Sequence, residues 1–160
     1  MTNKKKPAGK SVIRTGRVSS IDYKRGTCEV TYSDRGESVT ASLPSLSNSE
    51  YRMPNIGDVV LVNHLSNGTS AGVVVGTIWN DTNKPPEGYK GLYRKEFGTE
   101  PGQAFERYDA GTGEYVLASD KKIKITANEA VISISESGAV EITSPVSIRI
   151  AAPSVDIVEG

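Results

Sequence analysis

The C-terminal quarter of the sequence repeats one short pattern, and this repeat restricts the possible folds more than any other feature. Between Asp120 and Gly160, pairs of β-branched aliphatic residues separated by one residue recur every seven to nine residues. Because side chains alternate between the two faces of a strand, both members of a pair point to the same side. Turn formers separate the pairs, so the pattern predicts very short strands with one apolar face each. The ten residues predicted to point inward are Ile123, Ile125, Ile132, Ile134, Val140, Ile142, Ile148, Ile150, Val155 and Ile157.

This apolar stripe needs a cover that the segment itself is too short to provide. Each side chain would contribute roughly 1.5–3 kcal/mol if it were buried, but a long solenoid would be needed to wrap the stripe within one chain. Three copies winding around a common axis would cover it and leave the charged residues outside. We therefore expect residues 120–160 to form a stiff trimeric rod, an intertwined triple-stranded β-helix or β-prism. The alternative from the pattern alone is a two-layer β-sandwich that packs on the preceding domain.

Composition agrees with a chain that assembles. Hydrophobic residues make up only 36% of the 160 residues, and 19 Lys and Arg balance 19 Asp and Glu. A neutral chain has no overall field that attracts nucleic acid or an anionic membrane. The sequence contains neither a signal-peptide pattern nor an apolar run of transmembrane length, which predicts synthesis in a host cytoplasm.

Residues 12–82 predict a small β-barrel. Hairpin turns join the first three strand candidates, and the longer insertion Pro44–Gly57 has no convincing helical pattern, so we expect a loop there. This order is typical of the five-stranded Greek-key barrel of the OB type. The strand candidates are Val12–Ile21, Thr27–Ser33, Ser38–Leu43, Asp58–His64 and Ala71–Ile78. The predicted barrel core comprises Val18, Cys28, Val30, Val39, Ala41, Val60, Val62, Val73 and Val75.

The order of these parts resembles that of the phage baseplate assembly protein V family. The similar barrel segments are Gly16-Arg17-Val18, Gly57-Asp58-Val59-Val60-Leu61-Val62 and Gly72-Val73-Val74-Val75-Gly76-Thr77-Ile78-Trp79-Asn80. A rigid exit, Asn83-Lys84-Pro85-Pro86, then leads to residues 93–115, which are similar to the neck hairpin of the family. Linker and neck together span residues 83–119, and the repeat follows in the order of the family.

The family contains the central spikes of contractile tails and is related to the spike proteins of type VI secretion. The resemblance implies a non-enzymatic homotrimer in the tail baseplate of a virion, tailocin or related injection particle. It implies a barrel collar mounted on a baseplate hub protein and a rod that pierces the target-cell envelope. The basic arm, residues 1–11, is expected to be flexible and to help docking.

Two departures from the family narrow this expectation. The largest spikes carry an inserted lysozyme domain, for which this chain has no length. Many short spikes end in a metal-gathering His-X-His apex, whereas this sequence ends Val155-Asp156-Ile157-Val158-Glu159-Gly160. We therefore expect no cofactor and no metal, and a separate protein that caps the tip.

The residues that could carry chemistry do not form a recognisable active site. His64 is the only histidine and Cys28 the only cysteine, and both lie in strand patterns where a structural role is expected. The acidic residues are scattered, so no catalytic or metal-binding residue is predicted.

Two other functions stay open from the sequence. A barrel of this type could bind single-stranded nucleic acid by stacking bases on Tyr23, Tyr32, Tyr51 and Trp79. That function would leave the C-terminal stripe unexplained, so we expect no nucleic-acid partner. A trimeric receptor-binding tail fibre would explain the rod.

Overall fold

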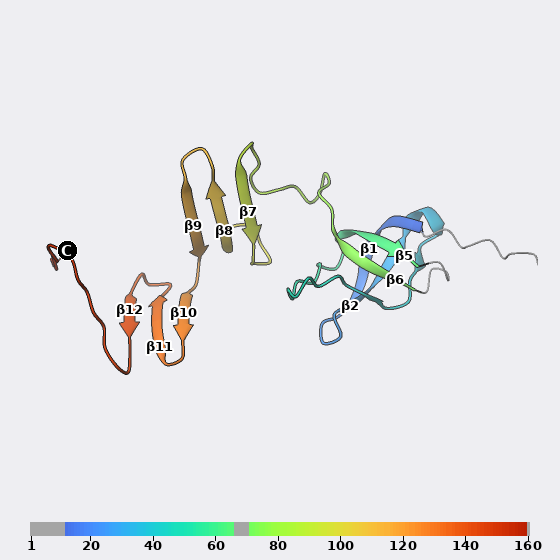
Figure 1. Ribbon diagram of the computed structural model, residues 1–160. Coiled ribbons are helices and arrows are strands. Elements are labelled where there is room, and N and C mark those ends of the chain that lie inside the picture. Colours follow the sequence, from blue (N-terminus) through green and yellow to red (C-terminus); the bar gives the residue numbers. More distant parts are fainter. Residues whose placement is uncertain (1–11, 66–70, 160) are drawn as a thin grey trace, which may run out of the picture. The chain divides into compact units, whose positions relative to one another are not determined.

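The computed structural model describes residues 12–65 and 71–159, and these residues form an all-β protein (Figure 1). The chain divides into two compact units between Pro85 and Pro86. The first unit contains one antiparallel sheet and the second contains two. No helix among the described residues is long and apolar enough to span a membrane. The expected basic arm, residues 1–11, lies outside the described residues.

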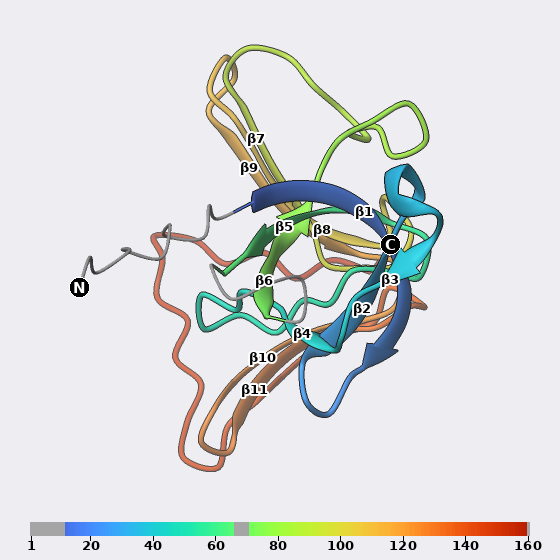
Figure 2. The ribbon, with the colours of Figure 1, turned by 90° about the vertical axis from the view of Figure 1, so that its right-hand side faces the viewer.

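The first unit is built around one long strand, β1. Its first half pairs with β5 and its second half with β2, with a bulge between Val18 and Ser20. Figure 2 shows how strongly β1 curves between these two neighbours. The elements are β1 (Val12–Asp22), β2 (Thr27–Tyr32), a 3-10 turn η1 (Ser33–Arg35), β3 (Ser38–Val39), β4 (Leu43–Pro44), β5 (Val59–His64) and β6 (Gly72–Thr77).

The two ends of this sheet approach each other. The strand order is β3-β2-β1-β5-β6, with β4 also paired to β2. Ser45, directly after β4, forms a parallel bridge to Val74 of β6, and the Leu46 N–H donates to the Val74 carbonyl at 2.8 Å. The curled sheet therefore encloses a single interior.

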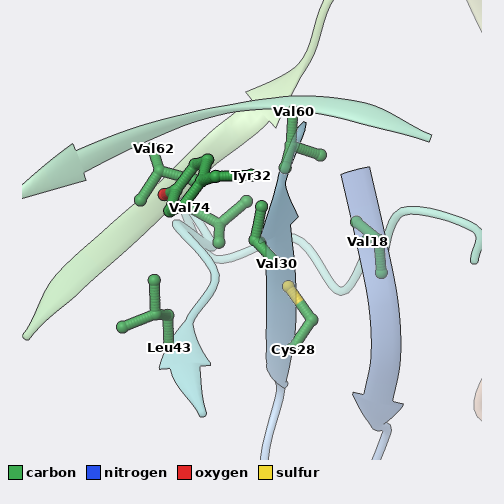
Figure 3. Close-up of a cluster of buried hydrophobic side chains, with 8 residues drawn as sticks. All are labelled: Val18, Cys28, Val30, Tyr32, Leu43, Val60, Val62 and Val74. Carbon is green, nitrogen blue, oxygen red and sulfur yellow. The ribbon is translucent and has the colours of Figure 1, made fainter. Parts of the chain in front are cut away.

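That interior holds the hydrophobic core of the first unit. Its side chains come from five strands and meet inside the curled sheet (Figure 3). The core residues are Val18, Cys28, Val30, Tyr32, Leu43, Val60, Val62 and Val74. Five of the residues predicted for the barrel core lie here, namely Val18, Cys28, Val30, Val60 and Val62.

The prediction was wrong for Val39 and Ala41, which are exposed. The third strand is interrupted between β3 and β4, and Thr40 takes the inward position instead. The Thr40 hydroxyl accepts a hydrogen bond from the Val30 N–H at 3.0 Å, and the Thr40 N–H donates to the Val30 carbonyl at 2.9 Å. The Thr40 hydroxyl thus takes the place of a backbone acceptor for the Val30 N–H. Thr40 therefore faces inward, and Val39 and Ala41 face outward.

The last strand predicted for the barrel, Ala71–Ile78, was assigned to the wrong face. Val74 is fully buried, whereas Val73 is half-buried and Val75 is exposed. The pairing of β5 with β6 shifts between Leu61 and Val62, so that Val62 lies opposite Val74. A shift of one residue exchanges the two faces of a strand.

The second unit contains two three-stranded sheets. The predicted neck hairpin is a three-stranded sheet, because a third strand, β7, pairs with β8. One sheet has the order β7-β8-β9 and the other the order β10-β11-β12. The strands are β7 (Leu92–Glu96), β8 (Ala104–Asp109), β9 (Glu114–Ser119), β10 (Ile123–Ala127), β11 (Ala130–Ile134) and β12 (Val140–Thr143). We call the first of these the neck sheet and the second the C-terminal sheet.

The close packing around Gly16 provides a test of the first unit. A Cβ atom on Gly16 would lie 2.5 Å from Val30 Cγ1 and 2.8 Å from the Thr31 carbonyl oxygen. We expect Gly16→Ala to destabilise this unit by about 1–3 kcal/mol. The added methyl group would force β1 and β2 apart, and the two strands cannot separate without breaking the hydrogen bonds between them. Urea unfolding followed by circular dichroism measures the change.

Gly88→Ala is the matched control, since a Cβ atom there would meet no atom within 4 Å. This control should unfold at the same urea concentration as the wild type or slightly above it. Equal unfolding midpoints for Gly16→Ala and Gly88→Ala would contradict the packing around Gly16.

Candidate functional site

His64 and Cys28 both belong to the interior of the first unit. The His64 Nε2 and Tyr32 hydroxyl oxygen lie 2.6 Å apart, and His64 Nδ1 is buried without a partner among the described residues. Burial raises the pKa of the Cys28 thiol, which disfavours the reactive thiolate. Within the described ranges, no group of three or more His, Cys, Asp and Glu side chains is arranged to hold a metal ion.

Of the four residues proposed to stack on nucleic-acid bases, three are exposed and one is buried. Tyr32 is 2% exposed and packs in the core, so it cannot stack on a base. The Tyr51 hydroxyl donates to the Tyr23 carbonyl at 3.1 Å. Trp79 is exposed. One of the four residues expected to stack on bases is therefore unable to do so.

The C-terminal sheet has one aliphatic face and one mainly polar face. In the strand register, Ile123 lies opposite Ile134, and Ile132 lies between Ile125 and Ile142. Directly opposite residues share a face, as do residues two apart on one strand. Six predicted inward residues therefore share one face: Ile123, Ile125, Ile132, Ile134, Val140 and Ile142. The other face carries Lys124, Ser133 and Glu141 in register.

This aliphatic face is open to solvent in the single chain. Its members other than half-buried Ile123 are between 42% and 63% exposed. Every hydrophobic side chain that is buried in the described part of the chain belongs to the first unit. The second unit thus has no buried apolar core among its described residues, although isolated sheets of this size need one to be stable.

The last part of the chain continues the pattern without forming strands. Residues 144–159 contain no strand, and Ile148, Ile150, Val155 and Ile157 are all exposed. The Ser144 hydroxyl accepts hydrogen bonds from the N–H groups of Val146 and Ser147 at 3.3 Å. From Ile148 to Glu159, the described chain makes no backbone hydrogen bond of its own. The four remaining predicted inward residues therefore lie on backbone that forms no strand and has no backbone hydrogen-bond partner within the described chain.

One face of the neck sheet carries a row of tyrosines. Tyr93, Tyr108 and Tyr115 lie opposite one another on β7, β8 and β9, and all three are about half-exposed. The next position along this face holds Lys95, Glu106 and Leu117. Desolvation and the nearby Glu106 carboxylate raise the pKa of Tyr115, so its hydroxyl stays protonated at neutral pH. Sequence analysis did not identify the row, because only the strand register brings the three rings together.

The opposite face of the neck sheet carries a network of ion pairs centred on Glu87. The Glu87 carboxylate accepts hydrogen bonds from Arg107 Nε and Nη2 at 3.1 Å and from Arg94 Nη1 at 3.0 Å. Arg94 also donates to Glu96 at 2.6 Å, and its guanidinium lies 4.1 Å from the centre of the Phe105 ring. This geometry makes Arg94 both an ion-pair and a cation–π partner.

Tyr89 extends the network to the end of β8. Its hydroxyl donates to Asp109 Oδ2 at 2.6 Å and accepts from Arg107 Nη2 at 2.6 Å. The hydrogen bonds from Arg107 hold the pKa of Glu87 below its ordinary value. The hydrogen bond from Tyr89, followed by one from the Gly111 N–H, does the same for the pKa of Asp109. Both carboxylates are therefore stabilised in their ionised form.

Comparisons with known proteins add no functional assignment. No model of a known protein family matches this chain, and no curated protein matches it significantly. The functional argument therefore depends on the aliphatic face of the C-terminal sheet, the tyrosine row and the ion-pair network.

The network around Glu87 predicts a dependence on pH. Because the pKa of Glu87 is lowered in the folded chain, its carboxylate stabilises the neck fully above its unfolded pKa. This stabilisation is lost as the pH falls through the lower folded pKa. Glu87→Gln should therefore lower the thermal midpoint at pH 7, and the difference from wild type should shrink between about pH 5 and pH 3. Circular dichroism measures both midpoints.

Glu100→Gln serves as the control, because the exposed Glu100 lies beside the neck sheet but outside this network. It should match the wild type over the whole pH range. A difference between Glu87→Gln and wild type that stays constant with pH would show that the carboxylate charge is not responsible.

Proposed function

We propose that this chain is a non-enzymatic, homotrimeric central spike of a contractile phage tail, tailocin or related injection particle. The observation that carries the proposal is the uncovered aliphatic face of the C-terminal sheet, in a unit whose described residues form no buried apolar core. Two further copies of the chain would cover this face and supply partners for the unpaired backbone of residues 148–159. The resulting rod is an intertwined β-prism with its aliphatic side chains inside.

Three copies suit this surface better than an unrelated partner does. The same i, i+2 aliphatic pairing continues from the C-terminal sheet into residues 144–159, which form no strand in the single chain, so each copy offers both a face and a segment that could pair. Charged residues such as Lys124 and Glu141 occupy the other face of the sheet and stay in water. Each fully buried aliphatic side chain would contribute roughly 1.5–3 kcal/mol, and a trimer buries three sets of them.

The first unit supports this proposal as an OB-type barrel that forms the collar of the spike. Its strand order, with the parallel bridge from Ser45 to Val74 closing the curled sheet, suits a five-strand Greek-key barrel. The interrupted segments β3 and β4 together take the place of the third strand. In this arrangement the collar mounts on a baseplate hub protein, and a separate protein caps the tip.

The work of such a spike is mechanical. Contraction of the sheath would drive the rod against the target-cell envelope, and a narrow prism with continuous backbone hydrogen bonds resists bending. No side chain has to perform chemistry for this task. The particle tail baseplate is the location that the proposal assigns to the protein.

The native mass of the purified chain tests the proposal directly. Light scattering or non-denaturing mass spectrometry should give about three times 17.1 kDa for the full-length protein. A chain that ends at Asp120 retains the barrel and the neck sheet but lacks the rod, and it should lose the trimer. A monomeric full-length chain would refute the spike.

A charge on the aliphatic face tests which side points inward. Ile134→Asp should abolish the trimer, since three carboxylates would meet on one dry axis at a cost of several kcal/mol per ion. Thr126→Asp is the control, because Thr126 is exposed on the polar face of the same sheet and should leave the native mass unchanged. If both variants trimerise equally well, the assignment of the faces is wrong.

A further inference from the structure

The tyrosine row of the neck sheet is an aromatic surface that the single chain leaves uncovered. Tyr93, Tyr108 and Tyr115 lie opposite one another, on strands that run about 4.7–4.9 Å apart. Each of the three side chains is between 42% and 58% exposed. Tyrosine rings lose little conformational entropy on packing, and their hydroxyl groups tolerate a partly wet contact. Such a row therefore has the chemistry of a protein interface.

The rest of this face suits a contact between identical surfaces. Lys95 and Glu106 lie directly opposite each other beside the row, and Leu117 completes that position. The next position pairs two small residues, Ala104 and Ser119. A surface that packs against copies of itself brings each charge close to its own equivalents, so a net charge would cause repulsion. The one cation and one anion on this face cancel, which favours other copies of this chain as its partner.

The covalent link to the C-terminal sheet keeps the neck sheets of a trimer near one another. Only three residues separate the end of β9 at Ser119 from the start of β10 at Ile123. Consecutive Cα atoms lie about 3.8 Å apart, so the Cα atoms of these two residues are at most about 15 Å apart, whatever the orientation of the sheets. Three C-terminal sheets that share an axis would therefore hold three neck sheets close to that axis.

The row is too small to assemble the copies without the rod. A tyrosine side chain covers roughly 150–250 Å², and only about half of each ring in the row is exposed. The three rings together offer far less than the roughly 800 Å² per partner that a stable interface buries. The row can therefore pack only when another contact already holds the copies together.

We propose that the tyrosine row is an interface between copies of this chain, in which the rings of three neck sheets pack against one another around one axis. The inference rests on the proposed trimeric spike and extends its interior from the rod into the neck. Nine rings would then form a shared aromatic core. Within one chain, the described residues of the second unit bury no hydrophobic side chain of their own.

Hydroxyl-radical footprinting of the full-length protein, read by peptide mass spectrometry, tests this interface. Tyr23 of the first unit is 59% exposed, close to the values of the row, so a monomer should be oxidised at similar rates at all four tyrosines. In the trimer we expect the row to be oxidised roughly fivefold more slowly than Tyr23, because the centre of an interface excludes water. In Ile134→Asp, which should not trimerise, the row should be oxidised as fast as Tyr23.

The outcomes separate this interface from the spike. A trimer by native mass whose row is oxidised as fast as Tyr23 would overturn the interface and leave the spike standing, with the row facing water or a different partner. A monomeric wild type would refute the spike and the interface together. Protection of the row in a monomer would also overturn the interface, since the rings would then be covered within one chain.

A charge in the middle of the row tests its contribution to assembly. Tyr108→Lys should lower the temperature at which the trimer dissociates by several degrees, because three ammonium groups would meet where rings had packed. Tyr108→Phe keeps the ring and should match the wild type. Tyr23→Lys makes the same exchange at an exposed tyrosine of the first unit and should also match it. Light scattering during heating measures all three, and equal values for Tyr108→Lys and Tyr23→Lys would overturn the proposal.

Discussion

The uncovered aliphatic face of the C-terminal sheet is the constraint on which the organisation of this chain depends. Burial of apolar surface is the main favourable term in folding, yet the described residues of the second unit bury no hydrophobic side chain. The first unit, by contrast, closes its sheet around a core of eight residues. One chain therefore combines a self-sufficient unit with one whose apolar surface is directed outward.

The aliphatic face of the C-terminal sheet could be predicted from the sequence, because its residues follow the two-residue period of a β-strand. Isoleucine pairs spaced by two residues predict a common face, and the observed register of Ile123 with Ile134 places them on one. The same reasoning failed for the run Val73-Val74-Val75, where three equal residues contain no alternation. The bulge beside Leu61 decides their orientation, and no local signal in the sequence marks it.

The neck sheet was the least predictable part, because its site residues are brought together by pairing over long distances. Glu87 lies seven residues from Arg94 and 20 from Arg107, and precedes the sheet that it binds. Glu87 lies outside any predicted strand and the segment has no helical pattern, so nothing in the sequence linked the three residues. The tyrosine row shares this property, since Tyr93, Tyr108 and Tyr115 meet only after three strands are in register.

The two faces of the neck sheet differ in charge, and this difference determines which face can pack against other copies of the chain. The face around Glu87 has its charges paired within the chain, and moving such a cluster into an apolar interface would add desolvation cost without new partners. The tyrosine face presents large rings that lose little entropy on packing, and among its paired residues only Lys95 and Glu106 are charged. In the proposed trimer the tyrosines therefore belong on the inner side of the neck, as the isoleucines do in the rod. The ion pairs then remain in water, where they hold Glu87 and Tyr89 against the neck sheet.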